Sequence, residues 1–343
     1  MAASELLRLV PDAPSALRDI LDPARGPVEP PIRSELFGLQ RFAQHGRSLA
    51  ETHRAERAHW GAPGFFPRLR DNIGVLREAH RYIGLQARTG YDISPAAEWL
   101  LDNFHLIEAQ LRQIREGLPR RYFRALPVLL DEPLAGLPRV YGVAWAFVAH
   151  TDGAFDEALA VRFLAAYEEV RPLDLREMWA LPTTLRVVMI ENLRRLAERV
   201  ATHKAAREVA NLCSNRLEHL SLHALDALLA LMRLRGVGQA FLAQMGQRMQ
   251  DRMTSGDAAP PDRYREWVQR ELPDLAAVQT QQRADQAADN LSVSNAVTSL
   301  RAIGDADWPD IVARSSTLMR LMLGSRVFEA EATCGPMLCT TGG

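Results

Sequence analysis

The chain has 343 residues, of which 47% are hydrophobic and 24% charged, a balance typical of a soluble globular protein rather than a disordered one. Its 41 basic and 42 acidic side chains nearly cancel, so no overall field attracts nucleic acid or anionic lipid, and we expect no nucleic-acid partner. At about 150 residues per domain, the length indicates roughly two domains or helical layers.

Other features of the composition concern chemistry and location. Lys204 is the only lysine, so a Schiff base or a phosphate-binding lysine would have to use it. Cys213, Cys334 and Cys339 are too few and too dispersed for a disulfide framework, which indicates a reducing compartment. The N-terminus lacks the features of a secretory signal, and the most apolar run, 140–149, is about half the length that spans a bilayer. We therefore expect a cytoplasmic chain without a membrane span.

The first part of the chain is predicted to be an arm followed by helices. Residues 1–31 contain six prolines, which lack backbone donors, so we expect an extended arm after one short helical turn. Apolar residues at helical spacing predict an amphipathic helix over 32–59 with Ser34 as N-cap, and a second helix over 67–89.

The clearest helix signal begins at Ser94-Pro95, an N-cap followed by proline at the first helical position. From Leu100 to Leu118 the apolar residues alternate steps of four and three. This heptad seam predicts one continuous helix packed against a partner helix.

Further helices are expected in the rest of the chain. Pro172 and Pro182 are predicted to end helices, because proline lacks the amide donor and clashes with the preceding turn. The expected helices cover residues 156–170, 175–180, 183–217, 218–234, 237–253, 264–271, 291–303 and 308–323. No run of alternating apolar and polar residues predicts a sheet. We therefore expect an all-α fold, a multi-helix bundle or an irregular array of helical hairpins with a proline-rich N-terminal arm.

Composition divides the chain into four expected parts. They are the arm over 1–31, a main helical domain over 32–255, a second small helical segment over 256–323 and an unstructured tail over 324–343.

Five blocks of the sequence resemble a known family. They are IRSELFGLQRFAQHGRSLA (32–50), SPAAEWLLDNFHLIEAQLRQIREGLPRRYFRALP (94–127), PRVYGVAWAFVAHTDGAFD (138–156), MWALPTTLRVVMIENLRRLAERV (178–200) and LSVSNAVTSLRAIGDADW (291–308). Together they resemble the N-terminal region of the cyclic β-1,2-glucan synthases, membrane glucosyltransferases whose C-terminal part is similar to a glycoside phosphorylase. The family continues into transmembrane and UDP-glucose-dependent regions, whereas this sequence ends at Gly343 and no longer resembles the family after about residue 325. We therefore expect a chain truncated or frameshifted before the catalytic domains.

The resemblance implies a function and a set of partners. We expect a non-catalytic helical region, without a cofactor, that supports synthesis of cyclic glucan from UDP-glucose by packing on the glycosyltransferase and membrane part of a synthase. That part lies in the same chain in the family, which would place the region at the cytoplasmic face of the inner membrane. The alternative is a stand-alone helical domain that binds or acts on a carbohydrate such as β-1,2-glucan.

The block from Trp145 to Asp156 is the first candidate for a ligand or interface site. Aromatic faces such as that of Trp145 stack on pyranose rings, while polar side chains such as His150, Asp152 and Asp156 bond hydroxyl groups. The same residues suit a structural role, in which a buried helix is followed by a turn at Asp152 and an N-cap at Asp156. We favour the structural interpretation.

Asp102 and His105 are the second candidate. With Glu98 they occupy positions i, i+4 and i+7 of the expected helix, on the face opposite the heptad seam. Glycosyl transfer or hydrolysis would need a positioned pair of carboxylates there. A solvated helix face has the same pattern, and we again favour the structural interpretation.

His219, His223 and Asp226 form an H-x-x-x-H-x-x-D pattern, which on one helix face could coordinate zinc or iron. No glutamate follows the first histidine as in H-E-x-x-H, so the general base of that motif is missing. These three residues remain the alternative metal ligands. Otherwise we expect no metal and no catalytic residue, because nucleophile-elbow and phosphate-loop motifs are missing as well.

Overall fold

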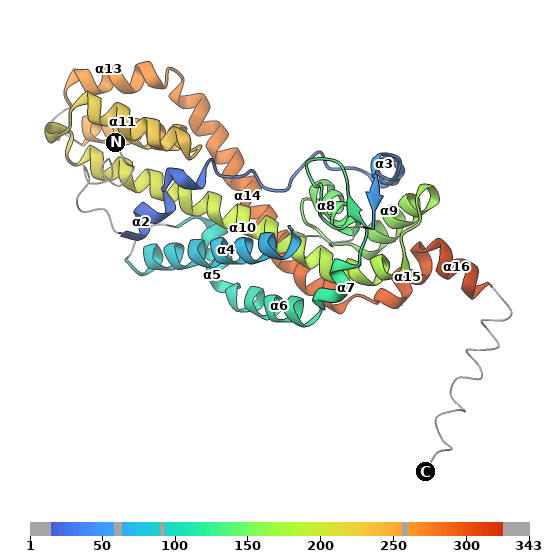
Figure 1. The fold of residues 1–343 in the computed structure, drawn as a ribbon. Helices are drawn as coiled ribbons and strands as arrows, with labels where there is room; N and C mark the ends of the chain where they lie inside the picture. Colours follow the sequence, from blue (N-terminus) through green and yellow to red (C-terminus); the bar gives the residue numbers. More distant parts are fainter. Residues whose placement is uncertain (1–14, 58–63, 90–92, 256–259, 325–343) are drawn as a thin grey trace, which may run out of the picture. The chain divides into compact units, whose positions relative to one another are not determined.

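The structure is a computed structural model that describes residues 15–57, 64–89, 93–255 and 260–324. Helices form nearly all of its regular structure (Figure 1). Within these ranges the strands are β1 (Ala55–Glu56) and β2 (Val128–Leu129), an antiparallel pair. The predicted all-α fold is therefore confirmed, while the expected tail lies almost entirely outside the described residues.

The chain forms two compact units, each built from three separate segments. Unit 1 comprises residues 1–31, 72–105 and 192–294, and unit 2 comprises residues 32–71, 106–191 and 295–343. The helices that contribute residues to both are α4 (Phe65–Arg88), α6 (Phe104–Glu116), α10 (Leu175–Ser214) and α14 (Leu275–Asp305).

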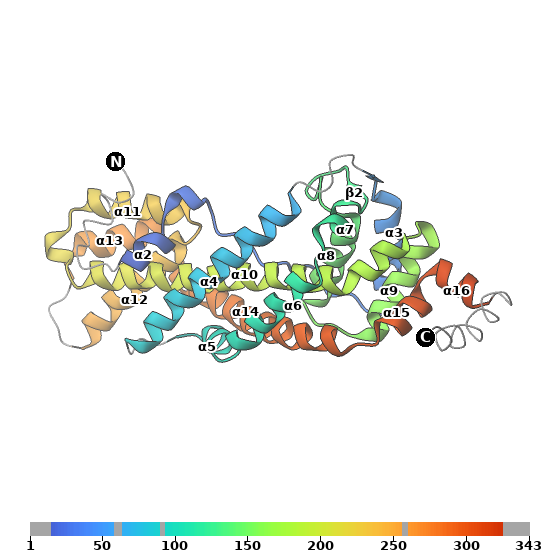
Figure 2. The ribbon, with the colours of Figure 1, turned by 60° about the horizontal axis from the view of Figure 1, so that its bottom comes forward.

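Unit 1 has a core formed largely by its C-terminal helices. Its further elements are α2 (Ser15–Ile20), η2 (Pro23–Arg25), α5 (Pro95–Asp102), η3 (Leu217–His219), α11 (Leu222–Leu234), α12 (Gly238–Thr254) and α13 (Asp262–Glu271). Helix α12 packs against α11 and α13, which lie close together in both ribbon views (Figures 1 and 2). Phe241 of α12 and Trp267 of α13 are fully buried, so large aromatic side chains fill this core.

Arginine side chains attach the proline-rich arm to the rest of unit 1. Arg235 is fully buried and donates a hydrogen bond to the carbonyl oxygen of Gly26. Arg194 forms an ion pair with Glu29, and Arg195 donates to an arm carbonyl oxygen at 3.0 Å. The arm is therefore held by charged donors that bond its carbonyl and carboxylate oxygens.

Unit 2 depends on the packing of α3 (Leu39–Thr52) against α9 (Glu157–Val170), which lie side by side in both views (Figures 1 and 2). Gly46 permits the close approach, since a Cβ there would lie 2.8 Å from the carbonyl oxygen of Phe163. Phe42 stacks on Phe163 with ring centroids 4.6 Å apart. The further elements of unit 2 are α7 (Arg120–Arg124), α8 (Arg139–Thr151), α15 (Trp308–Ser315) and α16 (Thr317–Leu323).

The first predicted helix is shorter than expected. Helix α3 begins at Leu39 with Gly38 as N-cap, so the predicted N-cap at Ser34 is wrong. The amide of Ser34 instead donates to the carbonyl oxygen of Ala149 at 2.9 Å. Leu36 is 63% exposed and does not belong to the apolar face that made the longer helix plausible.

The heptad segment contains two helices rather than one. Ser94 caps α5 as predicted, by accepting from the Ala97 amide. The helix ends at Asp102, however, and Asn103 follows as its C-cap, with its backbone amide and its side-chain amide both donating to the carbonyl oxygen of Trp99, at 3.1 and 2.9 Å. Helix α6 starts directly afterwards.

Proline is less disruptive than expected in α10. The helix runs continuously through Pro182, so the predicted break there is wrong. Leu181 and Leu185 are 1% and 3% exposed, and burial of this kind offsets the missing backbone hydrogen bond.

Two boundaries in the later part of the chain also differ from the prediction. Helix α14 begins at Leu275 rather than at 291, and Ser316 separates the last predicted helix into α15 and α16.

Candidate functional site

The block from Trp145 to Asp156 lies in unit 2, at the end of α8 and the start of α9. Trp145 is partly exposed, whereas Asp152 is buried. Asp152 adopts a left-handed backbone conformation with φ of 50° and pairs with Arg33 at 3.2 Å. Asp156 accepts a backbone hydrogen bond from the first turn of α9 at 2.8 Å, as an N-cap does. The polar groups of this block are thus used by the chain itself.

His150 lies in an aromatic cluster of unit 2. Its ring stacks on Phe37 with centroids 4.1 Å apart and meets His45 edge-on at 4.3 Å. Its Nδ1 donates to the carbonyl oxygen of Glu35 at 2.7 Å. Burial, followed by the charge of His150, lowers the pKa of His45. His150 therefore attaches the segment before α3 to α8.

Asp102 and His105 do not share a continuous helix face. Asp102 is the last residue of α5 and His105 lies in the first turn of α6, with the turn at Asn103 between them. Both side chains are exposed, and the His105 ring approaches the backbone oxygen of Asp102 at 3.1 Å. The predicted helical face with Glu98 is wrong because it assumed an unbroken helix.

The three alternative metal ligands are also divided between elements. His219 ends η3, whereas His223 and Asp226 lie on α11, which Ser221 caps. Asp226 accepts a hydrogen bond from the indole Nε1 of Trp267 at 2.7 Å. In the described part of the chain, no group of three or more His, Cys, Asp or Glu side chains is arranged to hold a metal ion.

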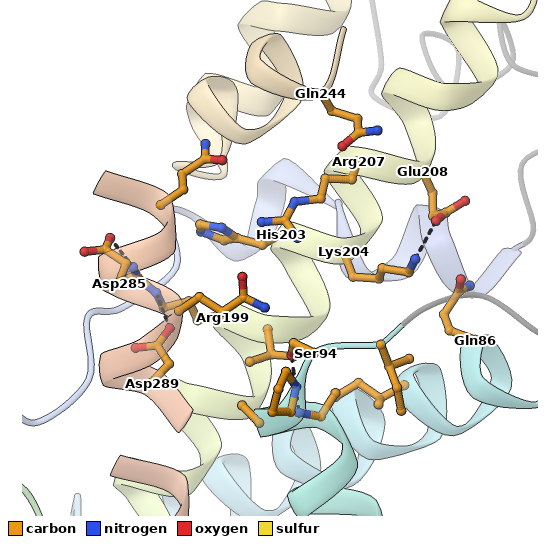
Figure 3. Close-up of a pocket in the computed structure, with 18 of the residues that line it drawn as sticks. Gln86, Ser94, Arg199, His203, Lys204, Arg207, Glu208, Gln244, Asp285 and Asp289 are labelled. Atoms are coloured by element: carbon orange, nitrogen blue, oxygen red, sulfur yellow. Dashed lines mark hydrogen bonds and ion pairs between the residues drawn. The ribbon is translucent and has the colours of Figure 1, made fainter. Parts of the chain in front are cut away.

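A polar cavity of about 440 Å³ lies within unit 1, lined mainly by α10 and α14, with residues of α4, α5 and α12 at its edges. Arg199, His203, Arg207 and Asn211 line it from α10. Their four-residue spacing places them on one face of the helix. Figure 3 shows Arg199, His203 and Arg207 extending from the same side of α10.

The acidic side chains of this cavity are paired with cations of the chain. Arg199 donates to Asp285 at 2.6 Å and to Asp289 at 2.9 Å. Lys204 lies 2.8 Å from Glu208 (Figure 3). These carboxylates therefore already accept charge-assisted hydrogen bonds or ion pairs from cations of the chain itself.

Arg207 and His203 differ from these paired groups. Among the described residues, no carboxylate lies within ion-pair distance of Arg207, and burial lowers the pKa of its guanidinium. Burial, followed by the positive charges of Arg199 and Arg207, lowers the pKa of His203 to about 4. His203 is therefore neutral at pH 7 and offers one donor and one acceptor nitrogen.

Amide side chains complete the cavity walls. They are Gln86, Asn211, Gln244, Gln282 and Gln286. Gln244 donates to the side-chain oxygen of Asn211 at 2.9 Å. Each amide carries both donors and an acceptor, so these walls can bond a hydroxyl group that acts either as a donor or as an acceptor.

No protein-family model matches the chain. The chain is 34% identical over 289 residues to cyclic β-(1,2)-glucan synthase NdvB of Rhizobium meliloti (strain 1021). The chain is therefore similar to a segment of a cyclic β-1,2-glucan synthase. The match covers 81% of this chain but 10% of NdvB, and it confirms the resemblance predicted from the sequence blocks.

The cavity of unit 1 was not predicted from the sequence. Its charged residues on α10 follow a stripe at i, i+4 and i+8, a pattern that a solvated helix face shares. The signal that could have found it is a polar stripe on α10 combined with a second one, Gln282, Asp285, Gln286 and Asp289, on α14. Without the fold, nothing in either stripe indicates that the two face each other.

Proposed function

We propose that this chain is a non-catalytic helical region of a cyclic β-1,2-glucan synthase-like protein, corresponding to the N-terminal region of the family. The observation that carries the proposal is the 34% identity to NdvB along 81% of the chain. In this role the chain supports synthesis of cyclic glucan from UDP-glucose by packing on the glycosyltransferase and membrane part, at the cytoplasmic face of the inner membrane. No helix among the described residues is long and apolar enough to span a bilayer.

The use of the buried carboxyl groups of unit 2 supports a non-catalytic role. Glu168 accepts from the backbone amides of Leu173 and Thr317, the latter at 2.9 Å. Glu177 pairs with Arg139 and also accepts from the amide of Asp174 at 2.9 Å. Burial raises the pKa of Glu168, but its two backbone donors give it a structural function in joining segments of unit 2.

The cysteine and tyrosine groups of the core point the same way. Burial raises the pKa of the Cys213 thiol to about 12, so it stays protonated and is a poor nucleophile at neutral pH. Tyr141 donates to Glu191, which also pairs with Arg68 at 2.6 Å, and burial raises the pKa of this phenol as well. The partners of Tyr141 and Glu191 are those expected of a packed interior rather than of a reaction centre.

Incubation of the purified chain with labelled UDP-glucose and Mg²⁺ or Mn²⁺ tests this proposal. We expect no labelled glucan above a no-protein blank, since glycosyl transfer needs a protonated acid or a free carboxylate nucleophile beside the sugar. An active synthase preparation, assayed in parallel, shows that the conditions permit synthesis. Labelled β-1,2-glucan made by the chain alone would overturn the non-catalytic assignment.

A further inference from the structure

The cavity of unit 1 contains a cation that its own walls do not neutralise. Arg199 is matched by two aspartates and Lys204 by Glu208, whereas no described carboxylate pairs with Arg207. A partly desolvated guanidinium without an anion is unfavourable. Arg207 also lines the cavity, so a ligand that enters it can supply the missing acceptor.

The chemistry of Arg207 specifies the charged part of such a ligand. A guanidinium presents a planar fork of donors that fits two oxygens of a carboxylate or a phosphate. His203, one helical turn away, is neutral at pH 7 and can donate to or accept from the same ligand. The three cavity carboxylates already accept from Arg199 and Lys204, so Arg207 is the cation available for an oxyanion.

The rest of the cavity specifies an uncharged, hydroxyl-bearing body. The amides of Gln86, Gln244, Gln282 and Gln286 line the same cavity as Arg207, and an amide side chain can both donate to and accept from a hydroxyl group. A volume of about 440 Å³ falls within the range of small-molecule sites and exceeds the needs of an isolated phosphate ion.

We propose that the unit 1 cavity binds a small polyhydroxylated anion, with its phosphate or carboxylate group on Arg207 and its hydroxyl groups on the surrounding amides. The ligand chemistry is that of a sugar phosphate or a sugar acid. The inference rests on the cavity alone and holds whether or not the chain supports a glucan synthase.

Isothermal titration calorimetry of the purified chain tests the proposal with four probes at matched ionic strength: glucose 6-phosphate, glucuronate, glucose and inorganic phosphate. We expect one or both of the sugar anions to bind with one-to-one stoichiometry, and which one binds identifies the preferred oxyanion. Glucose and inorganic phosphate, which each lack half of the recognised chemistry, should bind at least tenfold more weakly. Equal affinity for inorganic phosphate and the sugar anions would contradict the proposal, as would no binding of either sugar anion at millimolar concentration.

Variants separate recognition by Arg207 from general electrostatic attraction. Arg207→Gln should weaken binding of the sugar anion at least tenfold, and Arg207→Lys, which keeps the charge but not the fork, should weaken it to a smaller extent. Arg283→Gln makes the same charge change at an exposed position of α14 outside the cavity and should leave the affinity within twofold. Equal losses in Arg207→Gln and Arg283→Gln would overturn the site. Circular dichroism confirms folding, and Arg207→Lys serves as the test if Arg207→Gln does not fold.

Discussion

Replacement of Glu177 by glutamine is expected to lower the free energy of unfolding by about 3–5 kcal/mol. Glu177 is fully buried, and Arg139, whose side chain is 9% exposed, donates to it through Nε at 2.9 Å. Glutamine keeps the shape of the side chain but leaves the buried guanidinium without a counter-charge. It also weakens the bond from the Asp174 amide at the start of α10. Urea denaturation followed by circular dichroism at 222 nm measures the loss.

The matched control for this variant is an exposed pair in the same unit. Arg47 of α3 bonds Glu169 of α9 at 2.6 Å, but the two side chains are 46% and 50% exposed. Glu169→Gln should therefore cost less than about 1 kcal/mol, because water solvates the remaining arginine. Equal small losses for the two glutamine variants would show that Arg139 is not buried with Glu177.

Trp267→Ala is expected to cost about 3–5 kcal/mol through the cavity that it leaves in unit 1. Trp267 of α13 is fully buried, and its indole Nε1 donates to Asp226 at 2.7 Å. Truncation removes both the packing of the ring and the donor that Asp226 uses. The same urea titration measures the change in the free energy of unfolding.

Trp99→Ala is the comparison for this prediction. Trp99 belongs to α5 in unit 1 and is 40% exposed, so less of its surface is lost from the interior when it is truncated. Its loss should be clearly smaller than that of Trp267→Ala. The opposite order would contradict the packing described for α13.

Local signals in the sequence predicted much of the helical structure. Ser94 caps α5 because its side chain satisfies a free amide of the first turn. Asp156 caps α9 in the same way, which places the start of that helix correctly. The all-α fold was predictable because no segment of the sequence shows the alternating apolar and polar pattern of a strand, and the structure confirms it.

Other helix boundaries depended on interactions that sequence periodicity does not contain. Pro182 lies inside α10 because neighbouring side chains are buried on both sides of it. The first half of α14 is rich in polar residues and lacks an apolar stripe, yet Asp274 caps it by accepting from the Ala277 amide at 2.9 Å. Tertiary packing and capping outweighed local propensity in these two helices.

The candidate sites were less predictable than the helices. The sequence drew attention to His150, Asp152 and Asp156, whose polar groups the structure joins to neighbouring backbone or to Arg33. The cavity around Arg207 was overlooked because its two walls lie far apart in the sequence, on α10 and α14. A polar stripe on one helix indicates a solvated face until the facing helix is known.

Rescue of a truncated synthase in trans is the measurement that tests the central claim most directly. A cyclic β-1,2-glucan synthase lacking the segment that matches this chain would be prepared in membrane vesicles and assayed for labelled glucan from UDP-glucose. We predict that the truncated enzyme has lost most of its rate, that the purified chain restores a substantial part of it, and that an unrelated helical protein restores none. A truncated synthase that keeps the full rate without the chain would contradict a supporting role.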